Sequence, residues 1–532
     1  MKKEMTTMDF LDRAVDLYDD VVGVIADDGT EYTYAEFDER VSSLANVLAE
    51  HGVERGDRVA MLASNTHYFL EALYATNHLG AVYVPMNYRL VPENYEYILN
   101  DCAASVVIAD YDFAGKVEAV RDSIPAETFI GYKADEIDGD WEDYMSLVDE
   151  ASADPPERAD ISEDDDASIN YTSGTTGDPK GVVRTHRTEH WHALVLNQHM
   201  EIRDDDTYLW TLPMFHCNGW GHTYAITGTG GTHVCLRKFT PERTLEKIRD
   251  NDVSFMCGAP TVLNRVIAYK ENNPDVETTG DREVRIATAG SAPATATIET
   301  VEDEIGWRII HIYGLTETAP IITTSNSPRR LATRGRSLKV KQGSETLCTD
   351  LRVVHDDGTD VPADGETMGE VVVRGNQVMD RYLNKPDATE KAFNDRISGY
   401  FHTGDLATID EDGMISIQDR KKDIIISGGE NVSSIEVEDV LYDHSDIAKA
   451  AVIPTPSDEW GELVTAVVVP KPGVELSEDD VEAFCRDKMA GYKIPRKILV
   501  QEDLPETATG KVQKYQLRKD FWEDEERLVG QG

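Results

Sequence analysis

The sequence predicts an α/β protein with a large N-terminal body of helix-flanked sheets and a small C-terminal domain. Apolar residues alternate between helical and strand spacing through most of the chain, which is typical of parallel sheets covered by helices. The 532 residues are enough for about three or four domain-sized units. The composition changes near residue 420, where a polar, basic stretch interrupts the apolar pattern.

Helical and strand patterns follow one another along the N-terminal body. The spacing of apolar residues predicts, in order, a helix at 37–49, a strand at 58–63, a helix at 68–79 and strands at 81–84 and 105–109. Further along, Thr240 and Pro241 provide an N-cap and a first-turn proline, which predicts a helix from that point.

A basic stretch separates this body from the last part of the chain. Residues 419–423 read Asp-Arg-Lys-Lys-Asp, with three consecutive cations in an otherwise acidic chain. After it we expect strands at 424–426, 450–453 and 465–469, and a helix capped by Ser477. We therefore place a domain boundary at 419–422. The alternative is one continuous globule with a basic loop.

The chain is strongly acidic, with 100 Asp and Glu residues against 52 Lys and Arg and a formal net charge of −48. The acidic residues are spread along the chain, for example at 164–166, 204–206 and 478–480, and form no tail. We interpret them as a solvated coat of the kind that halophilic proteins use to stay soluble in high salt. An acidic partner-binding face is the alternative. Nucleic acid is disfavoured as a partner, because phosphate backbones attract positive surfaces.

Cysteine usage and the N-terminus bear on the compartment. The six cysteines lie far apart and include no C-x-x-C pair, which favours a reducing compartment and argues against a zinc site or a disulfide scaffold. Aspartates at 9, 12 and 16 interrupt any apolar leader, and no stretch approaches the ~20 apolar residues of a membrane span. We expect a cytoplasmic protein without a transmembrane segment.

The stretch 171–181, Tyr-Thr-Ser-Gly-Thr-Thr-Gly-Asp-Pro-Lys-Gly, has the composition of a phosphate-binding loop. Glycines let the backbone N–H groups converge on one point, hydroxyls add donors, and Lys180 supplies a positive charge. It is not a Walker A loop, because the Gly-Lys-Ser/Thr sequence is missing. A Gly/Thr-rich surface turn is the alternative.

Four further stretches carry candidate chemistry. The stretch 213–220 is rich in aromatic residues and contains His216, and 310–318 ends in Thr316, Glu317 and Thr318. A carboxylate between hydroxyls suits Mg²⁺, although a helix N-cap has the same composition. The turn at 400–406 ends on Asp405, whose carboxylate could accept hydrogen bonds from a ribose diol, and 504–512 places Lys511 on a Thr-Gly turn.

Taken in this order, the five stretches resemble the adenylate-forming superfamily of acyl-CoA synthetases, luciferases and peptide-synthetase adenylation domains. The resemblance covers essentially the whole chain. Residues 213–237 and 427–438 look most like the fatty-acyl and related acyl-activating CoA ligases. The resemblance implies an N-terminal adenylation body at 1–418 that includes a smaller β subdomain, a hinge at 419–424, and a mobile C-terminal α+β domain at 425–532.

The resemblance also implies where ATP and Mg²⁺ bind. Thr316 would touch the α-phosphate, and Glu317, assisted by Thr172, would bind Mg²⁺. Asp405 and Arg420 would contact the ribose. The β- and γ-phosphates would be held by Thr172, Ser173, Gly174, Thr175, Thr176, Gly177 and Lys180. The adenine pocket would be formed by Gly290, Ser291, Ala292, His311, Tyr313 and Gly314.

Further roles follow from the same resemblance. Lys511 would bridge the substrate carboxylate and the AMP portion, and His216 would gate the acyl tunnel, with Trp220, Gly221 and 228–231 expected along the acyl pocket. The C-terminal domain would swing about Lys422. Gly428, Gly429 and Asn431 would then face the coenzyme A tunnel, and Asn431 falls where other members carry glutamine or arginine.

The resemblance therefore predicts an ATP-dependent, AMP-forming acyl-CoA ligase for a fatty or related monocarboxylic acid. The acid would first become an acyl adenylate with release of pyrophosphate, and coenzyme A would then displace AMP. Transfer to a carrier-protein thiol is one alternative, and a nucleotide-binding regulatory protein without turnover is another. A homodimer is a common expectation for the family.

Overall fold

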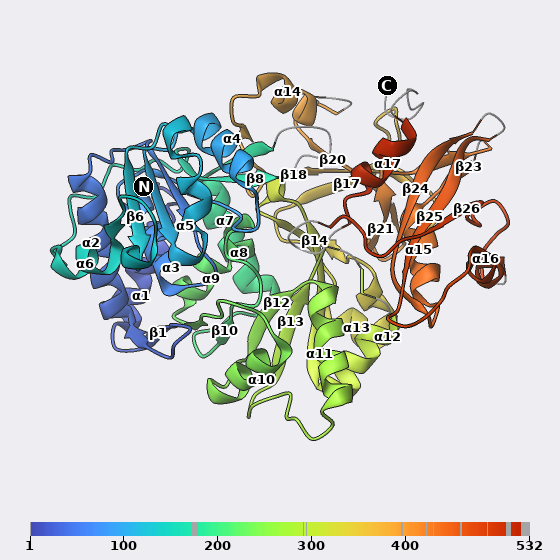
Figure 1. The fold of residues 1–532 in the computed structure, drawn as a ribbon, viewed down its shortest axis with the longest axis horizontal. Coiled ribbons are helices and arrows are strands. Elements are labelled where there is room, and N and C mark those ends of the chain that lie inside the picture. The colour runs from blue at the N-terminus through green and yellow to red at the C-terminus, as the bar shows by residue number, and fades with distance from the viewer. Residues whose placement is uncertain are drawn as a thin grey trace. The chain divides into compact units, whose positions relative to one another are not determined.

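The computed structural model describes residues 2–172, 179–290, 292–293, 295–394, 397–421, 423–428, 430–457, 460–486, 488–506 and 512–522, without the side chains of 328, 333, 334, 337, 394, 431 and 520. The described chain forms two compact units (Figure 1). The first lies within Met1–Gly174, Asp178–Asp350 and Arg374–Ala392. The second lies within Leu351–Val373 and Phe393–Gly532.

An eight-stranded sheet carries the first candidate motif of the first unit. Its strands pair in parallel from β8 through β7, whereas the β8–β9 and β9–β19 pairs are antiparallel. In spatial order the strands are β19 (Arg381–Tyr382), β9 (Lys180–Thr185), β8 (Asp166–Thr172), β4 (Val82–Pro85), β3 (Arg58–Leu62), β5 (Val106–Asp110), β6 (Thr128–Tyr132) and β7 (Glu142–Asp143).

A nine-stranded sheet forms the rest of the first unit's β-structure. It is parallel from β14 to β1 and antiparallel at both edges. In spatial order the strands are β16 (Ser344–Glu345), β15 (Ile321–Thr324), β14 (Trp307–Gly314), β13 (Val284–Thr288), β12 (Phe255–Gly258), β10 (Thr207–Leu209), β11 (Thr232–Val234), β1 (Val22–Ile25) and β2 (Glu31–Thr33).

Helices cover both sheets, as the alternating pattern predicts. The first group is α1 (Met8–Tyr18), α2 (Tyr34–Glu50), α3 (His67–His78), α4 (Pro92–Cys102), α5 (Tyr111–Glu118), α6 (Tyr144–Glu150) and α7 (His186–His199). The second group is α8 (Cys217–Trp220), α9 (His222–Thr229), α10 (Pro241–Asp250), α11 (Pro260–Asn272), α12 (Thr295–Thr300), α13 (Pro328–Arg334) and α14 (Pro386–Asn394). Short 3-10 helices are η1 (Arg121–Ser123), η2 (Ala134–Glu136), η4 (Thr316–Thr318) and η5 (Arg336–Val340), and η3 (Val301–Ile305) is a π-helical segment.

The core of the first unit explains these assignments. Thr33 and Glu36 form a capping box that starts α2, and Thr240 caps α10 by accepting a hydrogen bond from the Arg243 N–H. Every residue of α3 is buried, including Glu71, whose carboxylate pairs with Arg40 at 2.6 Å. One continuous hydrophobic cluster includes side chains from both sheets. A helix buried on all sides needs a charge partner for each buried acid.

The second unit contains two smaller sheets. A four-stranded sheet has the order β17 (Asp350–Val354), β18 (Gly369–Arg374), β20 (Phe401–Ile409) and β21 (Ile415–Arg420). The other has β23 (Glu430–Val432), β22 (Ile425–Ser427), β25 (Gly461–Pro470) and β24 (Ile447–Ser457), with β26 (Lys497–Val500) parallel beside β25. Its helices are α15 (Ser434–Tyr442), α16 (Glu478–Arg486) and α17 (Lys514–Trp522).

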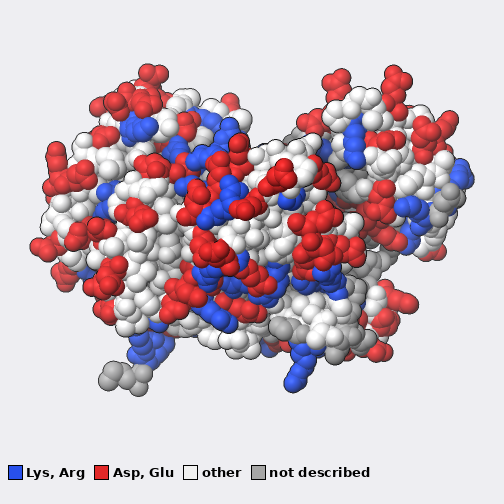
Figure 2. Space-filling view, turned by 90° about the horizontal axis from the view of Figure 1, so that it is seen from below, with Lys and Arg blue, Asp and Glu red and all other residues white. Residues whose placement is uncertain are grey.

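The predicted fold class is confirmed: helix-flanked sheets form the large N-terminal part, and smaller sheets with few helices follow it. Figure 2 shows Asp and Glu side chains scattered over the face in view, with Lys and Arg between them. In the described part of the chain, no helix combines the length and the apolar composition that crossing a bilayer requires.

Candidate active site

The Gly/Thr-rich stretch joins β8 to β9, and these two strands pair in antiparallel fashion. Thr172 and Lys180 are cross-strand partners, and the Thr172 hydroxyl donates to the Lys180 carbonyl at 3.5 Å. Five of the predicted phosphate-binding residues, Ser173, Gly174, Thr175, Thr176 and Gly177, lie outside the described residues. The two that the structure describes are therefore side by side at the base of the loop.

The second motif lies where β14 ends. A Cβ added to Gly314 would sit 1.7 Å from the Pro320 carbonyl oxygen, so the close approach of these two backbone segments requires glycine. Thr316 and Glu317 follow in η4, and the Thr318 hydroxyl accepts a hydrogen bond from the Leu315 N–H at 3.0 Å. Thr318 is thus a capping residue, which leaves the side chains of Thr316 and Glu317 to other contacts.

Tyr382 on β19 connects the two motifs. Its hydroxyl donates to Glu317 Oε1 at 2.8 Å, and Lys180 Nζ lies 4.7 Å from the centre of its ring. Burial and the charge of Glu317 raise the pKa of the Tyr382 hydroxyl, so it stays a neutral donor at neutral pH. Lys180, Tyr382 and Glu317 therefore form one cluster. The motifs did not predict Tyr382, because a two-residue strand leaves no periodic signal.

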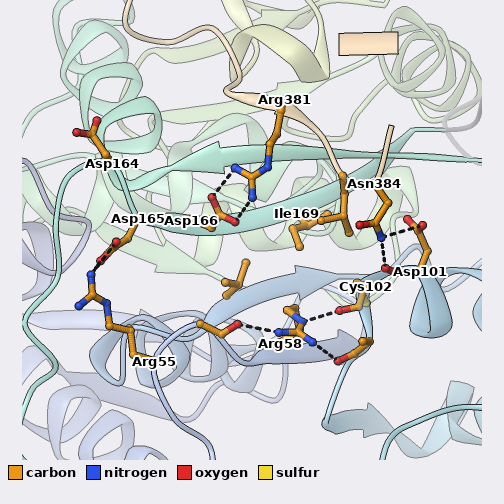
Figure 3. A pocket seen from close by; sticks show the side chains of 15 residues that line it. Arg55, Arg58, Asp101, Cys102, Asp164, Asp165, Asp166, Ile169, Arg381 and Asn384 are labelled. Atoms are coloured by element: carbon orange, nitrogen blue, oxygen red, sulfur yellow. Dashed lines mark hydrogen bonds and ion pairs between the residues drawn. The ribbon is translucent and has the colours of Figure 1, made fainter. Parts of the chain in front are cut away.

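Figure 3 shows how the β19 segment is held. A cavity of about 540 Å³ is lined by apolar residues and by charged side chains, several of which form ion pairs. Arg381 binds Asp166 through both terminal nitrogens, at 3.0 and 2.6 Å, and the Asn384 amide donates to the Asp101 carbonyl at 2.8 Å. These contacts bind residues 381–384 to β8 and to the end of α4. They fix the strand from which Tyr382 points to Glu317.

The aromatic stretch forms an unusual turn next to the same site. His216 is half-buried, and the following residues, Cys217–Trp220, form a short left-handed turn called α8 here, which ends at Gly221. The Cys217 thiol donates to the Thr316 hydroxyl at 3.2 Å. Burial raises the pKa of this thiol to about 11, so it remains protonated and able to donate. The stretch that contains His216 is thereby joined to η4.

Side chains from the core occupy the space beside the glycines that were expected along the acyl pocket. A Cβ on Gly228 would lie 2.4 Å from the Phe10 ring, and one on Gly230 would lie 2.4 Å from the Tyr18 ring. Both rings belong to α1. Helix α9 is buried over nearly its whole length, from His222 to Gly228. This region therefore packs against α1, and space for an acyl chain is limited there.

Residues expected around adenine show two kinds of environment. His311 is fully buried, and burial lowers the pKa of its imidazole to about 4, so it is neutral at pH 7. Its Nδ1 lies 3.1 Å from the Lys339 carbonyl, to which the neutral ring donates. Tyr313 and Ala292 are only partly buried, and Gly290 has φ +96° in the turn before Ala292. Ser291 lies outside the described residues.

In the second unit, the two expected ribose ligands are cross-strand partners. Asp405 on β20 faces Arg420 on β21, and Arg420 Nε lies 3.4 Å from Asp405 Oδ1. The Asp405 N–H donates to the Thr403 hydroxyl at 3.1 Å. Residues that are fifteen positions apart in the sequence thus converge on one spot, as an antiparallel pair requires.

The glycine segment of the second unit approaches an aromatic ring. Gly428 has φ +61°, and a Cβ there would sit 2.8 Å from the Trp460 ring. The Gly428 N–H donates to the Trp460 carbonyl at 2.9 Å, and Arg496 lies 4.2 Å from the same ring. The Asn431 backbone pairs with Ile426, and its side chain is not described. Lys422, Gly429 and Lys511 lie outside the described residues.

Comparison with known families covers most of the chain. The family described as AMP-binding enzyme matches residues 11–383, and its C-terminal domain matches residues 436–511. The chain belongs to the AMP-binding enzyme family. The predicted membership of the adenylate-forming acyl-CoA synthetase superfamily is confirmed by these two matches, which lie in the expected order.

Relatives of this AMP-binding enzyme align over nearly their full length. It is 36% identical to 2-methylpropanoate–CoA ligase CCL4 of Humulus lupulus, covering 97% of this chain and 94% of the relative. It is also 36% identical to 4-hydroxybutyrate–CoA ligase 2 of Metallosphaera sedula, with the same coverage. The crystal structure of the anthranilate CoA ligase AuaEII in complex with anthranoyl-AMP superposes with a TM-score of 0.87 at 25% identity, covering 98% of each chain.

Proposed function

We propose that this protein activates a short monocarboxylic acid with ATP, releasing pyrophosphate, and transfers the acyl group from the adenylate to coenzyme A. The observation that carries the proposal is the cluster of Lys180, Tyr382 and Glu317, in a chain that matches both family domains. It brings a cation and a carboxylate to the base of a glycine-rich loop. This is the pairing that a polyphosphate with its metal ion needs.

The first half-reaction must bring two anions together. A free carboxylate is a poor electrophile, and its attack on the α-phosphate of ATP makes an anhydride whose leaving group is AMP. Lys180 and the N–H groups of the loop would hold the outgoing β- and γ-phosphates. Thr316 would donate to the α-phosphate, and Lys511 would neutralise both the carboxylate and the phosphate that it attacks.

The donor set fits Mg²⁺. Glu317 offers a carboxylate and Thr172 a hydroxyl, which are hard oxygen ligands, and Mg²⁺ usually takes one or two such groups and completes its shell with substrate phosphates and water. Bound there, the ion would offset charge on the phosphates. Among the described residues, no cluster of three His, Cys, Asp or Glu side chains gathers to hold a metal by itself. A site shared with substrate needs no such cluster.

The proposed nucleoside ligands include the Asp405–Arg420 pair. We propose that Tyr313 and the turn at 290–292 enclose adenine, while Asp405 accepts hydrogen bonds from the ribose hydroxyls and Arg420 contacts the same ribose. The 3.4 Å pair between Asp405 and Arg420 supports this, because the arginine orients the carboxylate that would bind the diol.

The second half-reaction needs a free path for the thiol. We propose that the body at 1–418 and the C-terminal domain at 425–532 reorient about the hinge 419–424, near Lys422, which withdraws Lys511 after adenylation. Gly428 then suits a narrow channel for the pantetheine arm, because its backbone has no side chain to block it. Asn431 would lie near the same channel, with a shorter reach than glutamine or arginine.

Two observations support a short acid. Phe10 and Tyr18 fill the space at Gly228 and Gly230, so a long chain meets the α1 core there. The relatives named for 2-methylpropanoate and 4-hydroxybutyrate also act on four-carbon acids by their names. We propose that His216 and Trp220 enclose the acyl group of such an acid.

A panel of acids tests this function. Pyrophosphate release is measured with ATP, Mg²⁺ and straight or branched acids from two to sixteen carbons, each with and without coenzyme A. We expect pyrophosphate with the short acids, and a thioester only when coenzyme A is added. ADP and phosphate as products would contradict the proposal. A holo carrier protein offered in parallel separates coenzyme A from a protein-bound thiol as the acceptor.

The compartment and the salt environment are part of the proposal. All six cysteines are free, the net charge is −48, and acidic side chains are scattered over the face that Figure 2 shows, which supports a reducing cytoplasm with high salt. Because salt screens repulsion between exposed charges, we expect activity and melting temperature to rise between about 0.1 M and 2 M KCl. A protein that loses activity over this range would contradict the salt adaptation but leave the ligase function untouched.

A further inference from the structure

We propose that Asn218, Glu189 and Arg184 form a buried positioning network, which fixes the turn at 217–221 and thereby sets the affinity for the acid. This inference rests on the proposed function, in which the neighbouring residues His216 and Trp220 enclose the acyl group. Asn218 lies in the aromatic stretch 213–220, whereas Arg184 and Glu189 lie outside the five stretches that carry the family resemblance. The network lies entirely within the described residues of the first unit.

The turn has a backbone conformation that L-residues avoid. Five consecutive residues have positive φ, namely Cys217 at 52°, Asn218 at 50°, Gly219 at 60°, Trp220 at 54° and Gly221 at 76°. In the left-handed region Cβ approaches the following carbonyl oxygen, so only glycine and, less often, asparagine adopt it readily. Two of the five residues, Cys217 and Trp220, are disfavoured in this conformation. Contacts from outside the turn must therefore impose the conformation.

Asn218 is the point where the turn is fastened. Its side-chain amide donates to Glu189 Oε1 at 2.7 Å, and its side-chain oxygen accepts from the Asn170 amide at 3.4 Å. The Thr223 hydroxyl donates to its carbonyl at 3.1 Å. Asn218 is fully buried, so losing the amide would leave the buried Glu189 with one donor fewer.

Glu189 joins this turn to the phosphate hairpin. Its Oε1 also accepts from the Ser168 hydroxyl at 2.7 Å and lies 3.0 Å from a terminal nitrogen of Arg184. Ser168 is on β8 and Arg184 on β9, and both charged side chains are completely buried. Within the described residues, two nitrogens of Arg184 and Glu189 Oε2 have no hydrogen-bond partner. An ion pair this incompletely satisfied adds little stability, which favours a role in fixing geometry.

The other sides of the turn are also occupied. A Cβ on Gly219 would lie 2.2 Å from the Trp210 ring, and one on Gly221 would lie 2.5 Å from His192 Nδ1. The Trp220 N–H donates to the His216 carbonyl at 3.3 Å, and Cys217 reaches Thr316. A shift of the turn would therefore move His216 and Trp220 together. Binding of the acid should therefore be affected more strongly than binding of ATP.

Asn218→Gly is the most direct test. Glycine accepts positive φ without cost but lacks the amide, so the variant removes the contact with Glu189 and adds no backbone strain. We expect KM for the acid to rise about tenfold or more, because a displaced pocket wall weakens binding by this order. KM for ATP should change less than about twofold. Amide exchange measured by mass spectrometry should become faster across 216–221.

Glu189→Gln is the second variant, with Asp206→Asn as its matched control. Asp206, which directly precedes β10, is likewise buried. Its carboxylate accepts a hydrogen bond from the Ser254 hydroxyl at 2.6 Å and pairs with Arg285. Both substitutions remove the charge of a buried carboxylate that faces a serine and an arginine. Both should lower the melting temperature. Only Glu189→Gln should raise KM for the acid and speed exchange at 216–221.

The outcomes separate this inference from the proposed function. A KM for the acid in Asn218→Gly within about twofold of wild type overturns the network's role, and so do equal increases in Asn218→Gly and Asp206→Asn. If the wild-type protein releases no pyrophosphate with any acid, the proposed function fails. Exchange at 216–221 then decides by itself whether the network fixes the turn, because unchanged exchange in Asn218→Gly overturns it.

Discussion

The two units of the protein bury ionisable groups in opposite ways. The first buries neutral histidines and pairs each buried acid with an arginine, as in Glu189 with Arg184. The second surrounds one lysine with carboxylates: Lys514 lies 2.7 Å from Glu438 and close to Asp419 and Asp423. The difference indicates how the stability of each unit changes when a buried charged side chain is removed. An arginine–carboxylate pair fixes direction, whereas a lysine among several acids acts as a central positive charge.

The lysine cluster also reaches the proposed hinge. The Asp419 carboxylate accepts hydrogen bonds from the Ser434 N–H at 2.6 Å and from its hydroxyl at 2.7 Å, and Asp423 pairs with Arg518 of α17. The basic stretch 419–423 is therefore bound at both ends to helices of the second unit. Burial raises the pKa of both Asp419 and Glu438, and Lys514 offsets part of that effect.

Removing the central cation should have the largest effect. Lys514→Met leaves Glu438 and Asp419 buried without their counter-charge, and we expect a loss of about 3–5 kcal/mol in the free energy of unfolding of the second unit. Urea titration followed by amide exchange measures it. The loss should shrink at about pH 5, because the carboxylates can then take up protons.

Lys449→Met is the control for this substitution. Lys449 pairs with Asp503 and Glu506 at 2.8 Å on the surface, where such pairs contribute about 0–1 kcal/mol. Equal losses for the two variants would show that the lysine cluster is no more important than an exposed ion pair.

The next largest effect is expected in mild acid, where the stabilities of the two units should change in different directions. Burial lowers the pKa of His186, His222 and His311 to about 4 and that of His233 to about 3, so in the first unit protons bind more tightly to the unfolded chain. The stability that these groups contribute is present above about pH 6.5 and is lost as pH falls toward 4. Glu189, whose pKa burial raises, opposes this loss only in part.

The second unit should respond in the reverse sense. Burial raises the pKa of Asp419 and Glu438. Protonation of these groups favours the folded state as pH falls. Amide exchange from about pH 7 to pH 5, corrected for intrinsic rates, should show opening free energies that fall by a few kcal/mol in the first unit only. A parallel fall in both units would contradict the comparison.

Tyr382→Phe should have the smallest effect on stability and a selective one on activity. The substitution removes the hydrogen bond to Glu317 and leaves the ring beside Lys180. A hydrogen bond to a charged group contributes about 1.5–3 kcal/mol, so we expect kcat/KM for ATP to fall about tenfold to a hundredfold. Pyrophosphate release at varied ATP and Mg²⁺ measures it.

Tyr144→Phe provides a matched control within the same unit. Its hydroxyl donates to Glu71 at 2.6 Å, also a tyrosine–glutamate bond, in the fully buried core. This variant should lose stability and keep its kcat/KM for ATP. If the two variants lose activity equally, Tyr382 has no specific role at Glu317.

The sequence predicts some of these features and misses others for physical reasons. Elements with strong periodicity have bounds within a few residues of those expected. The strand expected at 58–63 is β3 (Arg58–Leu62), and the helix expected at 37–49 is α2 (Tyr34–Glu50). Glu317 and Lys180 stand out because their neighbours are glycines and hydroxyls. Tyr382 and Glu189 do not, because their meaning depends on partners 65 and 29 residues away in the chain.

Buried polar residues are the hardest to interpret from sequence. His311, expected near adenine by resemblance, donates to the Lys339 carbonyl in the fully buried core. The glycines at 228 and 230, expected along the acyl pocket, instead accommodate rings of α1 from the start of the chain. In each case the partner comes from a distant segment, and no local pattern identifies it.

The path of the chain limits how this enzyme can be dissected. Strand β9 pairs with β8 on one side and with β19 on the other, yet the chain leaves the first unit after Asp350 and returns only at Arg374. An expression fragment that stops at Asp350 would lack β19 and expose the open edge of β9, a template for aggregation. Cutting after Ala392 keeps that edge covered but removes β20, the partner of β18, so an open edge then appears on β18 instead. Neither cut leaves every strand of the fragment with all of its partners.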